Sequence, residues 1–568
     1  MSEHFIFLFY ILLFIFSTIG YGEIFSKTVN KSLINYNIGY KGLIGFFFIS
    51  LISLISSYFF SHNFIHNIVL HFVGIFGFIS FLIKKKNNQI ETKYFILLLL
   101  ILLIGSYLYK NHDDFAYYHL TYSLNLSENK FIIGTGIFSH GFRTFSSIFY
   151  YNSILYMPLI NFYLFHIGPF FILVFFNYII FEKLFKSYKI DEINFLYYFK
   201  ILIIVFVNVT FYRIGEHGTD RSAQILLLLI FLIFFELLFF KKDKNEMSSK
   251  LNLLLIIIFM ASAMKAIYYI YLILIPIVLI QKKYISKFFI PKNFSIIFVL
   301  LLSISINLIT NYFNTGCFLY PASKTCVGEN SWSIPKDKVK QMKIHYEWWA
   351  KAGGGPNYKS EINPEKYVKD FNWLNNWIDR HFFNKVSDTL IGIVFLCMVL
   401  FLTFKVLSKN KKKQKFNYIN LIIALLIPLI FLLEWFLNHP AMRYGGYVLL
   451  GLPFFIVTSF VLQTFDIEKR KIYITTVAFI SISLLLFFGR NITRLNKEIN
   501  FYGYDIFKSP YFYVEDVKSV KIFDNNDFQV YTTTDNKMCW ASKTPCSYFK
   551  KIKNEKFLGL NVVIGDNR

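Results

Sequence analysis

The side chains best suited to catalysis are two adjacent carboxylates, Asp113 and Asp114, near the start of a polar stretch that spans residues 110–143. They follow an apolar run, and carboxylates at the water-facing end of a membrane span are costly to keep near lipid and usually functional. Successive helical residues point about 100° apart, so the two carboxylates cannot hold one atom in the same way. One could act as general base toward an acceptor hydroxyl while the other holds a divalent metal or the acceptor. The alternative is that the pair caps the following helix, because an acid near a helix N-terminus stabilises that helix by roughly 0.3–1 kcal/mol.

The same stretch supplies four candidate substrate ligands, which are Tyr118, His119, His140 and Arg143. His119 follows the acids by little more than one helical turn, so Asp114 and His119 are also the candidate ligands of a divalent metal, Mg²⁺ or Mn²⁺. A lone histidine near a membrane surface is more often an ordinary interfacial residue. The residues leave open whether a metal binds.

A second polar segment is the turn RIGEHGTDRS, residues 213–222, which places five ionisable groups between two apolar runs. A simple turn does not need so many charges. Either these groups form salt bridges with one another, or an arginine of the turn, Arg213 or Arg221, binds a phosphate. In the second case the acids Glu216 and Asp220 orient that arginine or hold a metal. Asp220 and Arg221 are therefore candidate substrate-binding residues.

Two further cations, Lys265 and Arg443, are candidates for binding an anionic leaving group. Lys265 stands between two apolar runs, where a lysine needs an anionic partner or water. Arg443 lies in the segment HPAMRYGG, whose two glycines let the backbone come close to a ligand. A lipid phosphate would supply the anion. The alternative for both residues is that the long side chain only reaches the membrane interface.

Membrane helices must position these candidates, because the composition is that of a polytopic membrane protein. Of 568 residues, 55% are hydrophobic and only 16% are charged. The net charge of +25 comes from short lysine clusters between apolar runs, as in cytoplasmic loops that face anionic lipid, and this distribution argues against a nucleic-acid partner. No basic segment precedes the first apolar run, and no cleavage site follows it, so it is expected to be a span rather than a signal peptide.

The apolar runs predict an all-α fold with about fourteen transmembrane helices. The predicted spans lie near residues 5–20, 43–60, 66–83, 94–109, 169–182, 197–212, 223–240, 251–264, 266–280, 294–312, 388–406, 418–437, 446–463 and 472–488. The run 251–280 is expected to form two short helices that meet at Lys265, whereas a single long span there would reverse everything that follows. The basic clusters at 84–86, 241–250, 281–287, 405–415 and 466–471 are placed inside and both termini outside.

This topology puts the candidate residues on one external face, in the loop 110–168, the turn 213–222, Lys265 and the turn 438–446. The loop 313–387 and the tail 489–568 share that face. Two cysteine pairs agree with it, since Cys317–Cys326 and Cys539–Cys546 are local pairs that could form disulfides in an oxidising compartment, and Cys397 stands alone in a span. The five tryptophans of the loop 313–387 suit either the headgroup interface or stacking on a sugar or lipid chain. Short β-prone runs at 519–523, 528–533 and 561–564 predict a small α/β domain in the tail.

The motifs taken together resemble a known superfamily. DDFAYYH at 113–119, the glycines Gly134 and Gly136 and the serines Ser146 and Ser147 resemble the first external loop of GT-C glycosyltransferases, which use polyprenyl-phosphate sugars. The segments GTDRSAQ, TGCFLYPASKTC and HPAMRYGG resemble a mostly uncharacterised bacterial group within it, so the resemblance covers about residues 94–460. The superfamily usually places the acid loop after its first span, whereas here about three earlier spans form an N-terminal extension, residues 1–93. The core is then 94–488, followed by the external domain 489–568.

The resemblance implies an inverting sugar transfer on the outer face of the bacterial inner membrane. A carboxylate of the first external loop deprotonates the acceptor hydroxyl, which attacks the anomeric carbon, and polyprenyl phosphate leaves with its charge held by Arg, Lys or His. The acceptor would be an envelope glycan, a lipid or a protein, and some members use a divalent metal.

Two other functions remain open from the residues. An O-antigen polymerase or ligase also joins lipid-linked sugars, but it relies on arginines in external loops rather than on an early acid pair. A flippase or transporter of lipid-linked glycans would place ionisable residues in mid-span. In this sequence the ionisable residues are expected on one face, with Glu236 and Glu434 as the nearest exceptions.

Overall fold

The structure is a computed structural model that describes residues 2–84, 86–190, 193–239, 243–288, 291–353, 363–411, 418–525, 528–534 and 537–565. Parts of three predicted basic clusters, namely Lys85, residues 241–242 and residues 412–415, lie outside the described residues.

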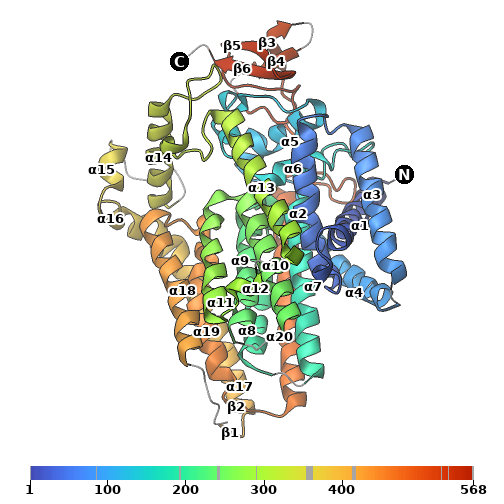
Figure 1. The fold of residues 1–568 in the computed structure, drawn as a ribbon, viewed down its shortest axis with the longest axis vertical. Coiled ribbons are helices and arrows are strands. Elements are labelled where there is room, and N and C mark those ends of the chain that lie inside the picture. The colour runs from blue at the N-terminus through green and yellow to red at the C-terminus, as the bar shows by residue number, and fades with distance from the viewer. Residues whose placement is uncertain are drawn as a thin grey trace.

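Long apolar helices dominate the fold (Figure 1). Within the described ranges, eleven helices are long and apolar enough to cross a membrane, as a hydrocarbon core of about 30 Å requires. They are built on α1 (Glu3–Thr28), α2 (Ile38–Ser57), α3 (Phe64–Lys84), α4 (Lys86–Leu102), α7 (Ile167–Lys189), α9 (Gly218–Phe239), α10 (Lys244–Met264), α13 (Pro291–Thr315), α17 (Ser387–Leu407), α18 (Tyr418–Asn438) and α20 (Lys469–Tyr502).

Three shorter apolar segments complete the bundle, and these are α8 (Phe195–Thr210), the pair η7 (Ala266–Ile273) and α11 (Leu274–Gln281), and α19 (Gly446–Leu462). Each predicted span lies on one of these long or short apolar segments. The prediction of a mostly helical, multi-pass protein is therefore confirmed at this level. The expected break at Lys265 is also present, because Lys265 has extended backbone angles, φ −154° and ψ 113°, between α10 and η7.

Smaller helices connect the bundle at its ends. The short α-helices are α5 (Leu120–Glu128), α6 (Ser147–Ser153), α12 (Ile285–Phe288), α14 (Lys336–Lys351), α15 (Pro364–Val368) and α16 (Leu374–Trp377). Two segments are π-helical, η3 (Phe115–His119) and η9 (Ile378–Val386). The remaining 3₁₀ turns are η1 (Lys31–Leu33), η2 (Leu103–Ser106), η4 (Thr135–Ile137), η5 (His140–Arg143), η6 (Ile214–His217), η8 (Ser323–Thr325) and η10 (Met442–Tyr444).

The C-terminal tail consists of two antiparallel hairpins, β3 (Ser519–Asn525) with β4 (Phe528–Thr533) and β5 (Ile552–Phe557) with β6 (Leu560–Gly565). Three of these four strands lie on the predicted β-prone runs. The predicted tail 489–568 contains the end of α20 followed by these strands, and its described residues after Tyr502 contain strands and no helix. The predicted boundary at residue 489 falls inside α20, which continues without interruption to Tyr502.

The opposite end of the bundle carries the short antiparallel pair of β1 (Asn410–Lys411) and β2 (Phe465–Asp466), at the bottom of Figure 1. This pairing brings together the basic segments that follow α17 and precede α20. Figure 1 shows the tail hairpins at the other end of the molecule.

The N-terminal helices pack tightly against the rest of the bundle. A Cβ atom on Gly45 of α2 would lie 1.7 Å from the carbonyl oxygen of Thr18 in α1, so only glycine allows this approach. The hydroxyls of Thr18 and Tyr151 lie 2.9 Å apart, within hydrogen-bond distance. His71 Nε2 lies 2.9 Å from the carbonyl oxygen of Ile154. Residues 1–93, predicted as an extension, thus support the second half of the loop 110–168, which carries the acid pair.

Buried charges occur away from the predicted face as well. Glu236, near the C-terminal end of α9, pairs with Lys183 at 2.6 Å and with Lys250. It lies about 24 Å along α9 from Asp220, given a rise of about 1.5 Å per residue. Lys41 and Glu23 form a second buried pair at 2.8 Å. The expectation that ionisable residues collect on one face was therefore incomplete, although these additional charges neutralise one another.

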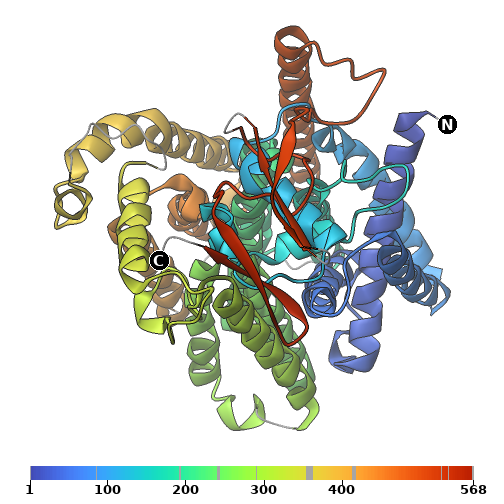
Figure 2. The same ribbon diagram turned by 90° about the horizontal axis from the view of Figure 1, so that it is seen from above.

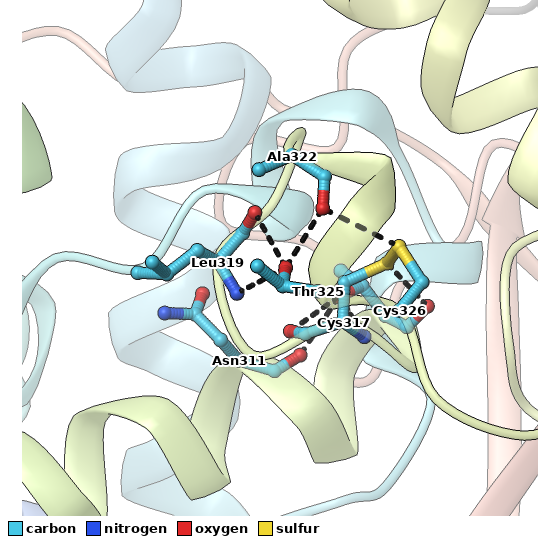
Figure 3. The surroundings of a disulfide bond; sticks show 7 residues. Asn311, Cys317, Leu319, Ala322, Thr325 and Cys326 are labelled. Atoms are coloured by element: carbon cyan, nitrogen blue, oxygen red, sulfur yellow. Dashed lines mark hydrogen bonds between the residues drawn. A yellow bond between two sulfur atoms is a disulfide. The ribbon is translucent and has the colours of Figure 1, made fainter.

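Both predicted disulfides are present, Cys317–Cys326 and Cys539–Cys546, and the one free cysteine among the described residues is the buried Cys397. Figure 3 shows that Cys317–Cys326 closes a small loop in which the hydroxyl of Thr325 donates to the carbonyls of Leu319 and Ala322.

Three of the five tryptophans in the loop 313–387 are buried in protein rather than presented to lipid or solvent. Trp332, Trp373 and Trp377 expose 7%, 1% and 4% of their surfaces. The indole N–H of Trp377 donates to the carbonyl of Pro440 at 2.6 Å, which ties this loop to the turn that carries Arg443. Their role is thus to fix the loop over the helix ends.

Candidate active site

The acid pair lies at the first turn of a short helix that continues through η3 into α5. The helix begins where Phe115 N–H donates to the carbonyl of His112 at 2.8 Å. Asp113 is exposed, whereas the Asp114 side chain is 30% exposed and points into the protein. Asp114 accepts no capping hydrogen bond from this helix. The capping alternative therefore does not account for Asp114, whose carboxylate lies 3.4 Å from Nδ1 of the neighbouring His112 and also faces a cation from another part of the chain.

Arg443 joins two carboxylates that are far apart in sequence. Its Nη2 lies 3.5 Å from Asp114 Oδ2, and its Nε donates to Asp220 Oδ2 at 2.7 Å. Lys265 Nζ forms an ion pair with the other oxygen of Asp220, Oδ1. The four side chains form a continuous chain of charge, which we call the Asp–Arg–Asp–Lys cluster, composed of Asp114, Arg443, Asp220 and Lys265.

Local structure explains how each member reaches this position. Asp220 lies in the first turn of α9, where a carboxylate is favoured by the positive end of the helix dipole. Lys265 occupies the break between α10 and η7, so its side chain leaves the helix end. Arg443 lies in η10, which ends at Gly445 with φ +104°, a conformation that favours glycine. Gln224 donates to the carbonyls of Met442 and Arg443 at 3.2 and 3.3 Å and fixes this turn on α9.

Aromatic rings surround the cluster on one side. Lys265 Nζ lies 4.3 Å from the centre of the Tyr444 ring, which suits a cation–π contact. Tyr118 packs edge-on against His119, with ring centres 4.4 Å apart. Desolvation, and to a lesser extent Asp114, raises the pKa of the Tyr118 phenol well above its ordinary value. The two formal cations and two formal anions of the cluster balance, so an incoming anion meets no excess negative charge.

His119 is neutral at physiological pH, because burial lowers its pKa to about 4. The ring lies close enough to Asp114, Asp220 and Arg443 for their charges to affect its pKa. It also lies beside Gly218, and a Cβ atom added to Gly218 would be 3.4 Å from it. Its predicted role as a substrate ligand is therefore limited to hydrogen bonding and packing.

The binding of a divalent metal by Asp114 and His119 stays a prediction. Asp114 and Asp220, the carboxylates of this site, are already neutralised by Arg443 and Lys265. The part of the chain that the structure describes holds no group of three or more His, Cys, Asp or Glu side chains arranged for a metal.

The turn 213–222 divides into two parts with different partners. Arg213 Nε donates to Glu216 at 2.7 Å, and Glu216 also faces Arg494 of α20 at 3.9 Å. Arg221 donates to the carbonyl of Arg213 at 3.3 Å. The salt-bridge interpretation thus describes Arg213 and Glu216, and Arg221 is not brought into the cluster. Of the turn's ionisable side chains that the structure describes, which are Arg213, Glu216, Asp220 and Arg221, Asp220 is the one that contacts the cluster.

His140 and Arg143 form a separate group. Arg143 Nη1 lies 2.9 Å from His140 Nδ1, and its Nε donates to the carbonyl of Gly136 at 2.9 Å. Burial raises the pKa of the phenol of Tyr346 in α14. Arg143 and Tyr444 are near enough to affect this pKa as well.

Sequence reasoning missed Tyr444, Gln224 and Tyr346. Tyr444 follows Arg443 directly, so the motif HPAMRYGG contained the signal, but nothing in the sequence showed that its ring faces Lys265. Gln224 ends the segment GTDRSAQ, but nothing in the sequence showed that its amide holds the turn of Arg443. Tyr346 had no signal in the sequence.

Residues 5–450 match the model of one protein family, described as "Domain of unknown function (DUF8201)". The match covers well over half of the 568 residues, so the chain belongs to this family. No curated protein and no solved structure matches the chain. The matched residues include all four members of the Asp–Arg–Asp–Lys cluster and also the three N-terminal helices, and they end before α20 and the tail.

Proposed function

We propose that this member of the DUF8201 family is a membrane glycosyltransferase that moves a sugar from a polyprenyl-phosphate donor to a hydroxyl of an envelope glycan, lipid or protein. The observation that carries the proposal is the bridge from Arg443 to both Asp114 and Asp220, with Lys265 on the same carboxylate. It joins a candidate base to two candidate phosphate-binding cations at one end of the membrane helices.

Asp114 is the general base of the proposed reaction, and the exposed Asp113 binds the acceptor beside it. The acceptor hydroxyl gives its proton to Asp114 while its oxygen attacks the anomeric carbon, and the bond from that carbon to the phosphate oxygen breaks. Attack from the face opposite the leaving group inverts the anomeric centre. Both carboxylates lie on the turn that precedes η3, so a helix rather than a free loop positions them.

Arg443 and Lys265 stabilise the leaving phosphate, whose negative charge increases as the bond breaks. Arg443 remains charged, because Asp220 above all raises its pKa. When Asp114 takes up the proton it becomes neutral, and Arg443 loses one of its two anionic partners. The charge of Arg443 is then available to the phosphate at the moment when the phosphate needs it. Asp220 keeps both cations in place throughout.

The proposed site lies on the outer face of the bacterial inner membrane. Both disulfides lie at the end of the molecule that carries the cluster, and an oxidising compartment favours their formation. The basic segments beside β1 and β2 lie at the other end, as expected of the cytoplasmic side. A donor whose phosphate sits at the membrane surface would then meet Lys265 and Arg443 directly.

The test is donor turnover by purified protein. Wild type, Asp114→Asn and Asp113→Asn proteins are incubated with radiolabelled polyprenyl-phosphate sugars and envelope extract, with and without EDTA. Transfer by wild type, its loss in Asp114→Asn and its persistence in EDTA are the expected results. Asp337→Asn is the matched control, because Asp337 lies on the exposed first turn of α14, where it pairs with Lys340 at 3.3 Å.

Other outcomes identify the alternatives. Transfer that survives in both single variants and in the double variant removes the base assignment. Joining of whole lipid-linked glycans, with no use of monosaccharide donors, would indicate an O-antigen polymerase or ligase. Movement of a lipid-linked glycan across the membrane without transfer would indicate a flippase.

A further inference from the structure

The helix that carries the acid pair has an irregular hydrogen-bond pattern. At the end of η3, Leu120 N–H donates to the carbonyl of Phe115, five residues back, instead of the carbonyl of Ala116, four residues back. A π-helical turn of this kind leaves one carbonyl without its helical donor, and such turns occur frequently at functional sites. Ala116 is 3% exposed, so water does not readily replace the missing donor.

The C-terminal tail supplies that donor. Trp540 N–H donates to the carbonyl of Ala116 at 3.2 Å, and the carbonyl of Trp540 accepts from Thr121 Oγ1 at 3.2 Å. The hydroxyl of Tyr548 donates to the next carbonyl, that of Tyr117, at 3.2 Å. The tail thus contacts the helix within the irregular turn and directly after it.

The disulfide Cys539–Cys546 holds these donors in one unit. Trp540 lies inside the loop that it closes, and Tyr548 lies two residues after it. Cys539 N–H donates to the hydroxyl of Tyr548 at 3.0 Å, so the disulfide loop also orients this side chain. Both cysteines are 1% exposed.

Two further contacts anchor the unit to the acid loop and to the tail sheet. Thr544 donates to Glu128 at the end of α5 at 2.6 Å, and Tyr531 N–H of β4 donates to the carbonyl of Pro545 at 2.9 Å. In Figure 2 the tail hairpins lie across the segments of the acid loop when seen from this end. The unit therefore touches both ends of the helix formed by η3 and α5.

We propose that the disulfide loop 539–546 and Tyr548 form a clamp that keeps residues 115–119 in the π-helical conformation, and that Tyr548 is a positioning residue for Asp114. Without the clamp, Leu120 N–H is free to return to the carbonyl of Ala116. That change would rotate the acid turn relative to α5 by about 100°, the angle of one helical residue. Asp114 would then no longer face Arg443.

The consequence for catalysis rests on the proposed function, but the structural part does not. Two variants test the clamp. Cys539→Ala/Cys546→Ala opens the loop, and Tyr548→Phe removes only the hydroxyl that donates to Tyr117. Tyr531→Phe is the matched control, because its hydroxyl contacts Gln529 of the same strand and not the acid loop.

The first readout is hydrogen exchange of the full-length protein in nanodiscs. Faster exchange of the amides of residues 115–121 is expected in both clamp variants, with α6 unchanged and with wild-type behaviour in Tyr531→Phe. Unchanged exchange of residues 115–121 in Tyr548→Phe and in the cysteine variant would overturn the proposal. This readout does not require any activity, so it distinguishes failure of the clamp from failure of the proposed function.

The second readout is sugar transfer. A positioning role predicts that Tyr548→Phe lowers kcat by about tenfold or more while KM for the donor changes little, since small misplacements of catalytic groups are costly. An unchanged kcat combined with faster exchange would show a structural contact without catalytic consequence and would also overturn the proposal.

Discussion

Arg443 Nε lies 2.7 Å from Asp220 Oδ2, although 223 positions separate the two residues in the chain. This contact decides how the site is built. It fixes the orientation of the guanidinium, leaves Nη2 directed toward Asp114, and shares with Lys265 the one carboxylate that holds both cations. Asp220 is thus the organising residue of the cluster, although it does not itself lie in the acid loop.

Asp114→Asn is expected to lower the rate of transfer by at least about a hundredfold, because loss of a general base typically costs 10²–10⁴-fold. Asp113→Asn is expected to raise KM for the acceptor, since Asp113 is exposed and has no role in the cluster. Initial rates at varied acceptor concentration separate the two effects. Equal loss of kcat in both variants would contradict the different roles assigned to them.

Asp220→Asn is expected to destabilise the protein, because Asp114 is then the one carboxylate of the cluster left to balance both Lys265 and Arg443. Removing one partner of a fully buried ion pair costs about 3–5 kcal/mol, and less is expected here because Lys265 retains solvent contact. Thermal unfolding of the purified protein in detergent measures the change. The double variant Asp220→Asn/Lys265→Met should recover part of the stability but no transfer. If the double variant is no more stable than Asp220→Asn alone, the unpaired Lys265 is not the cause of the destabilisation.

Lys265→Ala and Arg443→Ala are expected to raise KM for the donor by about tenfold or more, since a charged hydrogen bond contributes about 1.5–3 kcal/mol. KM for the acceptor should change little. Arg490→Ala is a suitable control, because Arg490 is an exposed arginine of α20 that stacks on Tyr212, 4.0 Å from the ring centre, outside the cluster. An equal effect on donor and acceptor would argue against phosphate binding by either cation.

His119 predicts a pH dependence of stability. Burial lowers its pKa in the folded state to about 4, below the unfolded value of about 6.5. Between these values the unfolded state binds more protons, so the contribution of His119 to stability is present above about pH 6.5 and is lost as the pH falls toward 4. His119→Gln should flatten this dependence by up to about 1.4 kcal/mol per pH unit. The free energy of unfolding is measured for both proteins from pH 7 to pH 4.5. The same pH dependence in wild type and His119→Gln would contradict this prediction.

Much of the fold could be predicted because the membrane imposes a simple length rule. Apolar runs near 20 residues predicted the helices. Lys265, in the middle of the run 251–280, predicted where that run divides into two segments. Both disulfides followed from two local cysteine pairs. The end of α20 at Tyr502 could not be predicted, because a helix that leaves the membrane keeps no hydrophobic signal.

The sequence by itself determined which residue types could do chemistry, namely the acid pair, Asp220, Lys265 and Arg443, because charges are costly near lipid and stand out among apolar runs. Only the tertiary structure decided which of them meet. It joined Asp114, Asp220, Lys265 and Arg443, sent Arg213 and Glu216 toward Arg494, and placed Trp540 on the carbonyl of Ala116. The physical reason is that ion pairs and backbone hydrogen bonds act over a few ångströms. Which side chains come that close depends on how the helix ends and the tail are packed, and local sequence does not record that packing.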